Sequence, residues 1–215
     1  IALWDKAEAE LKSVLDARYG KDGYKINEGD GAFYGPKIDI MMKDALNRVW
    51  QTGTIQLDFQ LSRNFNLTYT DKDGKQKIPV VVHRVIYGSM ERFIGILIEH
   101  FAGKFPFWIS ANQIGIVPVR DEHIDYANKI AEKIRMSGLR VSVDTSEGTM
   151  GNKIKSFRKK LLPYIIIVGD KEIENNTISL RVRTGKQIND ISLDSFISQC
   201  KNMVENHSLD LCEEF

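Results

Sequence analysis

One stretch constrains the fold more than any other: His83-Arg84-Val85-Ile86-Tyr87-Gly88-Ser89-Met90-Glu91-Arg92-Phe93-Ile94-Gly95-Ile96-Leu97-Ile98-Glu99-His100. It follows the β-branched run of residues 78–82, which is typical of a buried strand. Apolar residues after Gly88 surround the helical axis nearly completely, which predicts a buried helix over residues 89–101. Ser89 is a suitable N-cap for that helix. The sequence therefore predicts a strand that turns at Gly88 into a buried helix.

Arg92 falls in the first turn of this helix. A guanidinium group in a buried helix needs a carboxylate, a phosphate or an aromatic face, because an unpaired buried charge is costly. One interpretation is an internal ion pair with Glu91 or Glu99. The other is an arginine that binds a ligand. The residues alone leave both interpretations open.

Upstream, Gly31-Ala32-Phe33-Tyr34-Gly35-Pro36-Lys37-Ile38-Asp39 forms a compact polar loop. Gly35 and Pro36 stiffen its backbone, so the Tyr34 phenol and the Lys37 ammonium can point at one place. The alternative is a surface turn with a solvated lysine, since lysine is usually exposed.

The segment Trp50-Gln51-Thr52-Gly53-Thr54-Ile55-Gln56-Leu57-Asp58-Phe59 alternates as strands do. Its polar residues serve the fold, line a pocket or form one solvated sheet face. Ideal alternation places Gln51 opposite to Thr54 and Gln56. A bulge, or an irregularity at Gly53, must therefore intervene if all three line one pocket.

His83 lies at a strand end, where a lone histidine is more often a hydrogen-bonded core residue than a metal ligand. A zinc site needs about three protein ligands, and neither a cysteine nor a second histidine is near His83 in the sequence.

The remaining pattern predicts two kinds of architecture. The first part consists of a helix over residues 4–19, a weak strand at 24–27, strands at 37–42 and 49–59, and a hairpin of 64–70 with 77–82. The chain changes pattern at residues 106–110. Beyond them strands at 113–119, 139–143, 164–168 and 177–183 alternate with helices at 121–136, 151–162 and 193–204. This alternation predicts a mixed sheet covered on both faces.

Composition sets limits on function. The 215 residues have a formal net charge of +1, so any contact with RNA must come from local clusters of charge. The apolar runs are too short to cross a membrane. Cys200 and Cys212 form no disulfide framework, which favours a reducing, cytoplasmic compartment. Because the chain starts at Ile1 without an initiator methionine or a signal peptide, we expect it to be part of a longer protein.

The second part contains one local cluster of positive charge. A basic helix face is usually only solvated. Here Glu172 and Arg181 follow near strand ends, and such a mixture of charges suits the recognition of unpaired bases. The cluster comprises Lys153, Lys155, Arg158, Lys159 and Lys160.

The segment Gly88-Ser89-Met90-Glu91-Arg92 and its apolar helix resemble motif 3 of class II aminoacyl-tRNA synthetases. Together with the two upstream segments and His83-Arg84, they resemble the threonyl-tRNA synthetases, and the resemblance covers nearly the whole chain. It implies an α/β (α+β) chain of two domains. Residues 1–109 would be the C-terminal half of the antiparallel-sheet catalytic domain, and residues 110–215 the mixed-sheet anticodon-binding domain.

The resemblance also implies roles for individual residues. Arg92, Lys37 and Gln51 would be catalytic, and threonine and ATP would contact Tyr34, Gln56, Thr54 and Ser89. The tRNA anticodon would contact Glu172, Arg181 and Lys155. At Lys155 the family often has arginine, and lysine cannot reproduce a bidentate contact. His83 would be one of three zinc ligands, the other two lying upstream of this chain together with motifs 1 and 2.

The expected activity is that of a threonine–tRNA ligase, which uses ATP with Mg²⁺ to form threonyl-adenylate and then charges tRNA(Thr). The complete enzyme is expected to be a cytoplasmic homodimer, and this portion alone is expected to be inactive. The amino-acid sequences of the motifs resemble those of eukaryotic members of the family. Two alternatives are a non-enzymatic tRNA-binding or regulatory protein and a prolyl or seryl synthetase. The intact motif residues disfavour the first, and Tyr-Gly-Pro-Lys with Trp-Gln-x-Gly-Thr disfavours the second.

Overall fold

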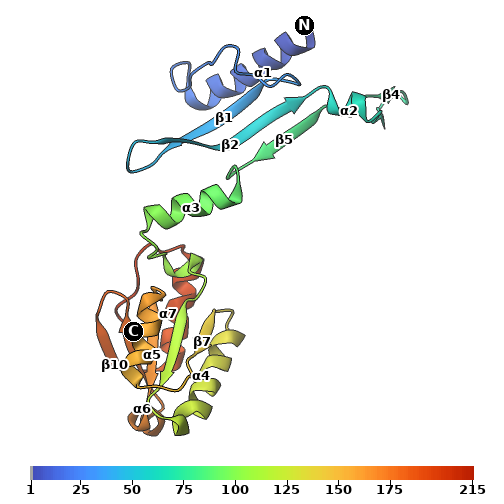
Figure 1. The fold of residues 1–215 in the computed structure, drawn as a ribbon. Coiled ribbons are helices and arrows are strands. Elements are labelled where there is room, and N and C mark those ends of the chain that lie inside the picture. Colours follow the sequence, from blue (N-terminus) through green and yellow to red (C-terminus); the bar gives the residue numbers. More distant parts are fainter. Residues whose placement is uncertain (1) are drawn as a thin grey trace. The chain divides into compact units, whose positions relative to one another are not determined.

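The computed structural model describes residues 2–215, and these residues divide into two compact units, 2–100 and Phe101–Phe215. Each unit is described by itself (Figure 1). No helix among the described residues combines the length and the apolar character needed to cross a membrane.

The first unit is built on a three-stranded antiparallel sheet in the order β1-β2-β5. Its strands are β1 (Lys37–Lys43), β2 (Val49–Asp58) and β5 (Val81–Val85). The helix α1 (Ala2–Tyr19) precedes the sheet, and the helix α3 (Met90–His100) follows β5. The short helix α2 (Leu61–Asn64) and the two-residue strands β3 (Tyr69–Thr70) and β4 (Gln76–Lys77) lie between β2 and β5 in the sequence.

Several predictions for this unit were wrong in detail. Residues 24–27 form no strand, and the predicted hairpin is reduced to the β3–β4 pair. The strand predicted at residues 78–82 is observed as β5, shifted towards His83, and it is at most half-buried. The helix after Ser89 forms as expected, but α3 has no buried residue. The reason is that its apolar residues have too little partner surface within residues 2–100.

The second unit contains a five-stranded mixed sheet in the order β10-β9-β8-β6-β7. The strands are β6 (Ile114–Pro118), β7 (Val141–Val143), β8 (Tyr164–Val168), β9 (Ile178–Val182) and β10 (Gln187–Ile191). The strand β6 runs parallel to β7 and β8, whereas β9 runs antiparallel to β8 and β10. The helices are α4 (Ile124–Met136), α5 (Met150–Lys159), α6 (Asp170–Asn175) and α7 (Leu193–Glu205), with 3₁₀ turns at Phe107–Ile109 and Asp121–His123.

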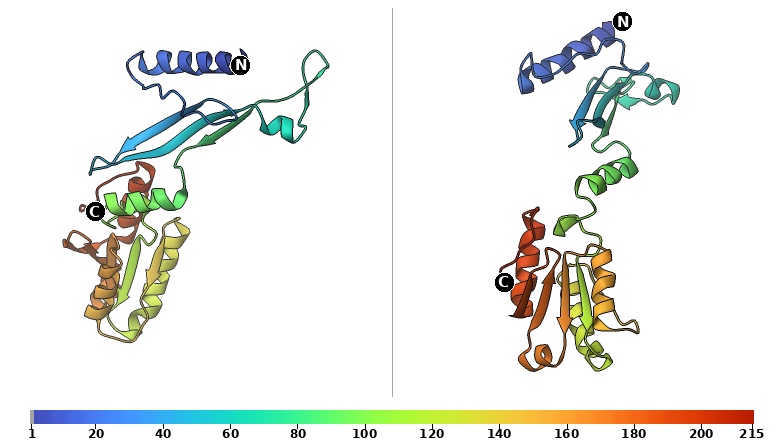
Figure 2. Two further views of the ribbon diagram at one scale, coloured as in Figure 1. Left: turned by 45° about the horizontal axis from the view of Figure 1, so that its top comes forward. Right: turned by 60° about the vertical axis from the view of Figure 1, so that its left-hand side comes forward.

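Helices cover both faces of this sheet, as the alternating pattern predicts. The strand β8 shows why: Tyr164, Ile166 and Val168 pack with α4 and α7, while Ile165 and Ile167 pack with α5. In the right-hand view of Figure 2, α7 and α5 lie on opposite sides of the sheet. The ring of Phe157 approaches β6 so closely that a Cβ at residue 115 would lie 2.7 Å from it, so this position requires glycine.

Candidate functional site

Polar side chains gather on one face of the three-stranded sheet of the first unit. The register pairs Lys37 with Gln56, Asp39 with Thr54, and Gln56 with His83, so these residues share a face. We call this face the polar face. Its members are Lys37, Asp39, Gln51, Thr54, Gln56, Asp58 and His83.

Gln51 joins the polar face because β2 contains a bulge. Ile40 pairs with Gly53 but the next residue, Met41, pairs with Gln51, so Thr52 is an extra residue in β2. An extra residue reverses the alternation of the strand, which brings Gln51 to the side of Thr54 and Gln56. The irregularity that a common pocket would require is therefore present.

The Tyr-Gly-Pro-Lys loop is attached to the neighbouring strand by main-chain bonds. The amide of Leu57 donates to the carbonyl of Pro36, and that of Phe59 donates to Tyr34. A Cβ at Gly35 would lie 2.0 Å from the carbonyl oxygen of Leu57, so only glycine allows this approach. The loop aims the Tyr34 hydroxyl at the sheet, where it donates to Gln56 Oε1 over 2.7 Å.

Lys37 and Asp39 form a close ion pair on the polar face. Lys37 Nζ lies 2.6 Å from Asp39 Oδ2, and the two side chains are 18% and 20% exposed. The alternative of a solvated lysine is therefore wrong. The bond to Asp39 raises the pKa of Lys37, against the opposing effect of burial. Burial acts to raise the pKa of Asp39, but the bond and the positive charge of Lys37, together with weaker effects that include the bond from Gln51, outweigh it and the pKa is lowered.

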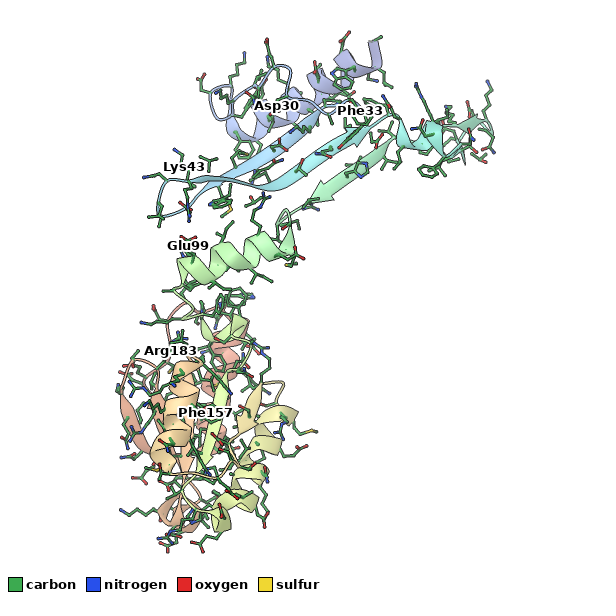
Figure 3. The ribbon with its side chains drawn as sticks, in the orientation of Figure 1. Asp30, Phe33, Lys43, Glu99, Phe157 and Arg183 are labelled. Atoms are coloured by element: carbon green, nitrogen blue, oxygen red, sulfur yellow. The ribbon has the colours of Figure 1, made fainter. Side chains whose placement is uncertain are left out.

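Among the described residues, Arg92 forms no ion pair with Glu91 or Glu99, so the interpretation of an internal ion pair was wrong. Its side chain is exposed, so the expectation of a buried guanidinium was wrong, because α3 itself is not covered. Its Nη2 donates to the carbonyl oxygen of Gln51 over 3.1 Å. Glu99, seen on α3 in Figure 3, pairs instead with Arg48 over 2.7 Å. Ser89 accepts a hydrogen bond from the backbone amide of Arg92 and so caps the helix as predicted.

His83 is oriented by a carboxylate. Its Nε2 lies 2.9 Å from Asp58 Oδ2, and the amides of Gln60 and Leu61 donate to Oδ1 of the same residue. These bonds lower the pKa of Asp58, the backbone bond from Leu61 and the His83 side chain contributing most. In the neutral tautomer that carries its proton on Nε2, His83 donates to Asp58 and its Nδ1 offers a free lone pair.

This geometry fits a zinc ligand, since imidazole ligands commonly donate their second nitrogen to a carboxylate. Within residues 2–215 no group of three ligating side chains includes His83, so the chain supplies a single ligand there. One such group lies in the second unit, where Arg120 already pairs with both of its carboxylates, Glu122 and Asp170.

The second unit carries a basic pocket of about 590 Å³ between α5 and β9. Met150 and Ile154 give it an apolar part, and its charged lining comprises Lys155, Arg158, Lys159 and Arg181. Arg181 Nε is buried and has no hydrogen-bond partner among the described residues. Two of the three predicted anticodon-contacting residues, Lys155 and Arg181, thus line one pocket.

Glu172, the third predicted anticodon contact, lies outside the lining of this pocket. One carboxylate oxygen accepts the amide of Gly169 over 2.8 Å, and the other accepts the hydroxyl of Ser179 over 2.7 Å. Both oxygens therefore have partners within the protein. Ser179 and Arg181 are two residues apart on β9, so their side chains lie on the same face of the sheet. Because Glu172 bonds to Ser179, it lies on the same side of the sheet as the pocket.

Sequence reasoning missed two carboxylates, Asp39 and Asp58, which hold the predicted site residues. The sequence could have indicated both carboxylates, because residues two positions apart on a strand share a face. Asp39 lies two positions from Lys37, and Asp58 lies two positions from Gln56. The register that brings Gln51 and His83 to them is not visible in one sequence.

Two family models match the chain. A "tRNA synthetase class II core domain (G, H, P, S and T)" matches residues 4–101, and an "Anticodon binding domain" matches residues 113–203. The chain is 48% identical to a threonine–tRNA ligase of Thermotoga petrophila over 213 residues, which are 99% of this chain and 33% of that protein. It is also 48% identical to the threonine–tRNA ligase of Clostridioides difficile over 203 residues, 94% of this chain and 32% of that protein.

A crystal structure of the RNA binding domain of threonyl-tRNA synthetase from Cryptosporidium parvum is similar in fold. The TM-score is 0.80 at 42% identity, and the match covers 94% of this chain and 51% of that chain. Against the two threonine–tRNA ligases, the chain spans about a third of the length of each relative. Since these relatives include bacterial proteins and one from Cryptosporidium, the eukaryotic origin indicated by the motifs stays a prediction.

Proposed function

Because the chain belongs to the threonyl-tRNA synthetase family, we propose that it forms part of a threonine–tRNA ligase. In this proposal residues 1–109 are the C-terminal half of the catalytic domain, and residues 110–215 are the anticodon-binding domain. The missing part of the catalytic site would come from the additional length that the relatives have.

One observation carries the proposal: predicted site residues from separate segments converge on the polar face. Tyr34 bonds to Gln56, Lys37 and Gln51 each bond to Asp39, and Arg92 bonds to the main chain of Gln51. A surface with no catalytic role has no need of such convergence. It combines cationic and amide donors, which suit a nucleotide and an amino acid carboxylate.

The proposed first step is attack of a threonine carboxylate oxygen on the α-phosphate of ATP. A new O–P bond forms, the bond to the β-phosphate oxygen breaks, and Mg²⁺-bound pyrophosphate leaves. In the second step a terminal ribose hydroxyl of tRNA(Thr) attacks the threonyl carbonyl, and AMP and the hydroxyl proton leave. The carboxylate of the first step needs no general base, so in that step the protein contributes orientation and charge neutralisation.

Each residue receives a role in this scheme. Arg92 and Gln51, with Ser89 and Thr54 nearby, would hold ATP. Lys37, Tyr34 and Gln56 would face the threonine side, where Lys37 would contact the carboxylate. The anionic groups of both substrates would meet Lys37 and Arg92 from two directions, which matches an in-line displacement that depends on positioning.

We further propose that Nδ1 of His83 is one of three ligands of a zinc ion, with Asp58 fixing the imidazole through Nε2. The other two ligands would lie on residues outside this chain. The zinc ion would bind the amino and hydroxyl groups of threonine together, which excludes valine because valine lacks the hydroxyl group.

For the second unit we propose that the basic pocket binds anticodon bases of tRNA(Thr). The unpartnered Arg181 Nε and the cationic lining support this role, because guanidinium groups stack on and hydrogen-bond to unpaired bases. Lys155 would contact phosphate or base as a point charge. For Glu172 to contact a base, its bond to Ser179 would have to be exchanged. The family also leads us to propose a cytoplasmic homodimer.

Charging of tRNA(Thr) by the intact gene product tests the proposal. We expect accumulation of threonyl-tRNA that depends on ATP, and at least a 100-fold loss of rate in Arg92→Ala with an unchanged melting temperature, since Arg92 is exposed and contacts only one carbonyl. Binding of tRNA(Thr) without any charging would instead support a non-enzymatic tRNA-binding protein.

A further inference from the structure

Asp39 joins two predicted site residues through its two carboxylate oxygens. Lys37 Nζ donates to Oδ2 over 2.6 Å, and Gln51 Nε2 donates to Oδ1 over 2.8 Å. Lys37 belongs to β1 and Gln51 to β2, so one side chain fixes donors from two strands. No other carboxylate among the described residues bonds to two of the predicted catalytic side chains.

The connection extends to a third segment. The main-chain carbonyl of Gln51 accepts a hydrogen bond from Arg92 Nη2 over 3.1 Å. Gly88 gives the guanidinium group its space, since a Cβ there would lie 2.9 Å from Arg92 Nη2. Gln51 thus bonds to Asp39 through its side-chain amide and to Arg92 through its main-chain carbonyl, so the side chain that Asp39 holds belongs to the residue that Arg92 contacts.

Asp39 is placed to orient these donors without competing for all of their hydrogen bonds. The Lys37 ammonium group has three N–H donors, and one of them points at Asp39. Two donors remain for a substrate. A lysine side chain without a fixed partner samples many rotamers, which a substrate would have to restrict on binding.

We propose that Asp39 is a positioning residue for amino acid activation, holding the side chains of Lys37 and Gln51 in the geometry that the substrates require. The inference rests on the proposed function. Asp39 touches no substrate in this scheme. It acts only through the residues that it holds, and its removal changes turnover because the donors are then misdirected.

The same hairpin contains a matched control. Asp44 lies in the β1–β2 turn and accepts bonds from the side chains of Arg48 and Trp50. It accepts more hydrogen bonds than Asp39, including two from main-chain amides, but none from a predicted site residue. A purely structural role for carboxylates in this hairpin would make the Asp44→Asn and Asp39→Asn variants equivalent.

The test uses the intact gene product and threonine-dependent exchange between ATP and pyrophosphate. We expect Asp39→Asn to lower kcat on the order of 100-fold and Asp39→Glu to lower it about 10-fold, both with folding and tRNA binding retained. Asp44→Asn should keep kcat within threefold of the wild type. In a double-mutant cycle, Lys37→Met should add little to the loss already caused by Asp39→Asn, because both changes remove one function.

The outcomes separate the two proposals. Wild-type exchange together with a folded Asp39 variant that keeps kcat within threefold overturns the positioning role and leaves the proposed function intact. Additive losses in the cycle, or unfolding of both Asp39 variants with Asp44→Asn folded, would assign Asp39 to the fold alone and overturn it as well. A wild-type protein without exchange overturns both proposals.

Discussion

The two units of this chain differ in what lies in their interiors. In residues 2–100 the one buried hydrophobic residue is Ala7, and the buried side chains include Thr52, Asp58 and Ser62. In residues 101–215 the core comprises two clusters of large apolar side chains, among them Phe107, Tyr164 and Phe196, all fully buried. Main-chain pairing and hydrogen bonds between polar side chains give the first unit its geometry, whereas the second unit also has a large apolar core.

This difference shows that polar side chains can be well oriented in a unit that has almost no apolar core of its own. Exposed ion pairs add little to the free energy of folding, so such pairs orient side chains more than they stabilise a fold. Apolar burial supplies most of the free energy of folding. In the proposed enzyme, the apolar residues that α3 leaves exposed would be covered by additional chain; they include Met90, Ile94 and Ile98.

Separating the units gives the largest expected effect. Residues 101–215 expressed alone should unfold in one cooperative thermal transition, because both faces of their sheet are covered. Residues 1–100 alone should show no cooperative transition, because they bury too little apolar surface. Calorimetry of the two fragments measures whether each one unfolds in a cooperative transition. A cooperative transition in residues 1–100 would break the comparison between the units.

Replacing His83 by alanine should abolish zinc retention in the intact gene product. A zinc site that loses one of three protein ligands binds the ion much more weakly. His83 is only half-buried, and its ring contacts Tyr34 and Asp58, so its replacement should leave the fold intact. Zinc is counted by metal analysis after gel filtration, and the melting temperature serves as the control. Full zinc occupancy in the folded variant would remove His83 from the proposed ligands.

Replacing Arg181 by alanine should weaken the binding of tRNA(Thr) about 10- to 100-fold, consistent with the loss of one stacked or bidentate base contact. Threonine-dependent exchange should be unchanged, since Arg181 belongs to the second unit. Lys159→Ala, on the same pocket, is the matched control and should lower affinity less and mainly at low salt. Parallel losses of binding and exchange would argue against separate tasks for the two units.

Acid should affect the first unit before the second, and this is the smallest expected effect. The side chain of Trp50 and bonds from Arg48 lower the pKa of Asp44 to about 2. A carboxylate with a lowered pKa contributes stability above its ordinary pKa near 3.8, and that contribution is lost as the pH falls towards 2.

The pKa values of Asp39, Asp58 and Asp71 in the first unit are also lowered, whereas Asp170 is the only carboxyl group among the described residues of the second unit whose pKa is clearly lowered. Amide exchange resolved by peptide, measured between pH 4 and pH 2, should show earlier loss of protection in β1 and β2 than in β8. Asp44→Asn should reduce the difference. Earlier loss in β8 would reverse the comparison.

The sequence predicted the second unit better than the first, for physical reasons. Five consecutive apolar residues define β8, and its bounds agree with the prediction. The strand β10 was missed because Asn189 and Asp190 break its pattern, Asp190 with a φ of 58°. The helix α6 was missed because its six residues present no apolar face.

In the first unit the motif residues could be identified, but their mutual contacts could not. The bulge at Thr52 decides that Gln51 meets Asp39, and a bulge arises from pairing between strands that one segment does not encode. The burial of α3 was predicted wrongly because it depends on partner surface, which periodicity does not report.

The most direct test of the central claim is threonine-dependent exchange between ATP and pyrophosphate by the intact gene product, with serine and valine as competing amino acids. We predict rapid exchange with threonine, weaker exchange with serine, and none with valine. No exchange with any amino acid, together with retained binding of tRNA(Thr), would contradict the claim that the polar face is part of a working catalytic site.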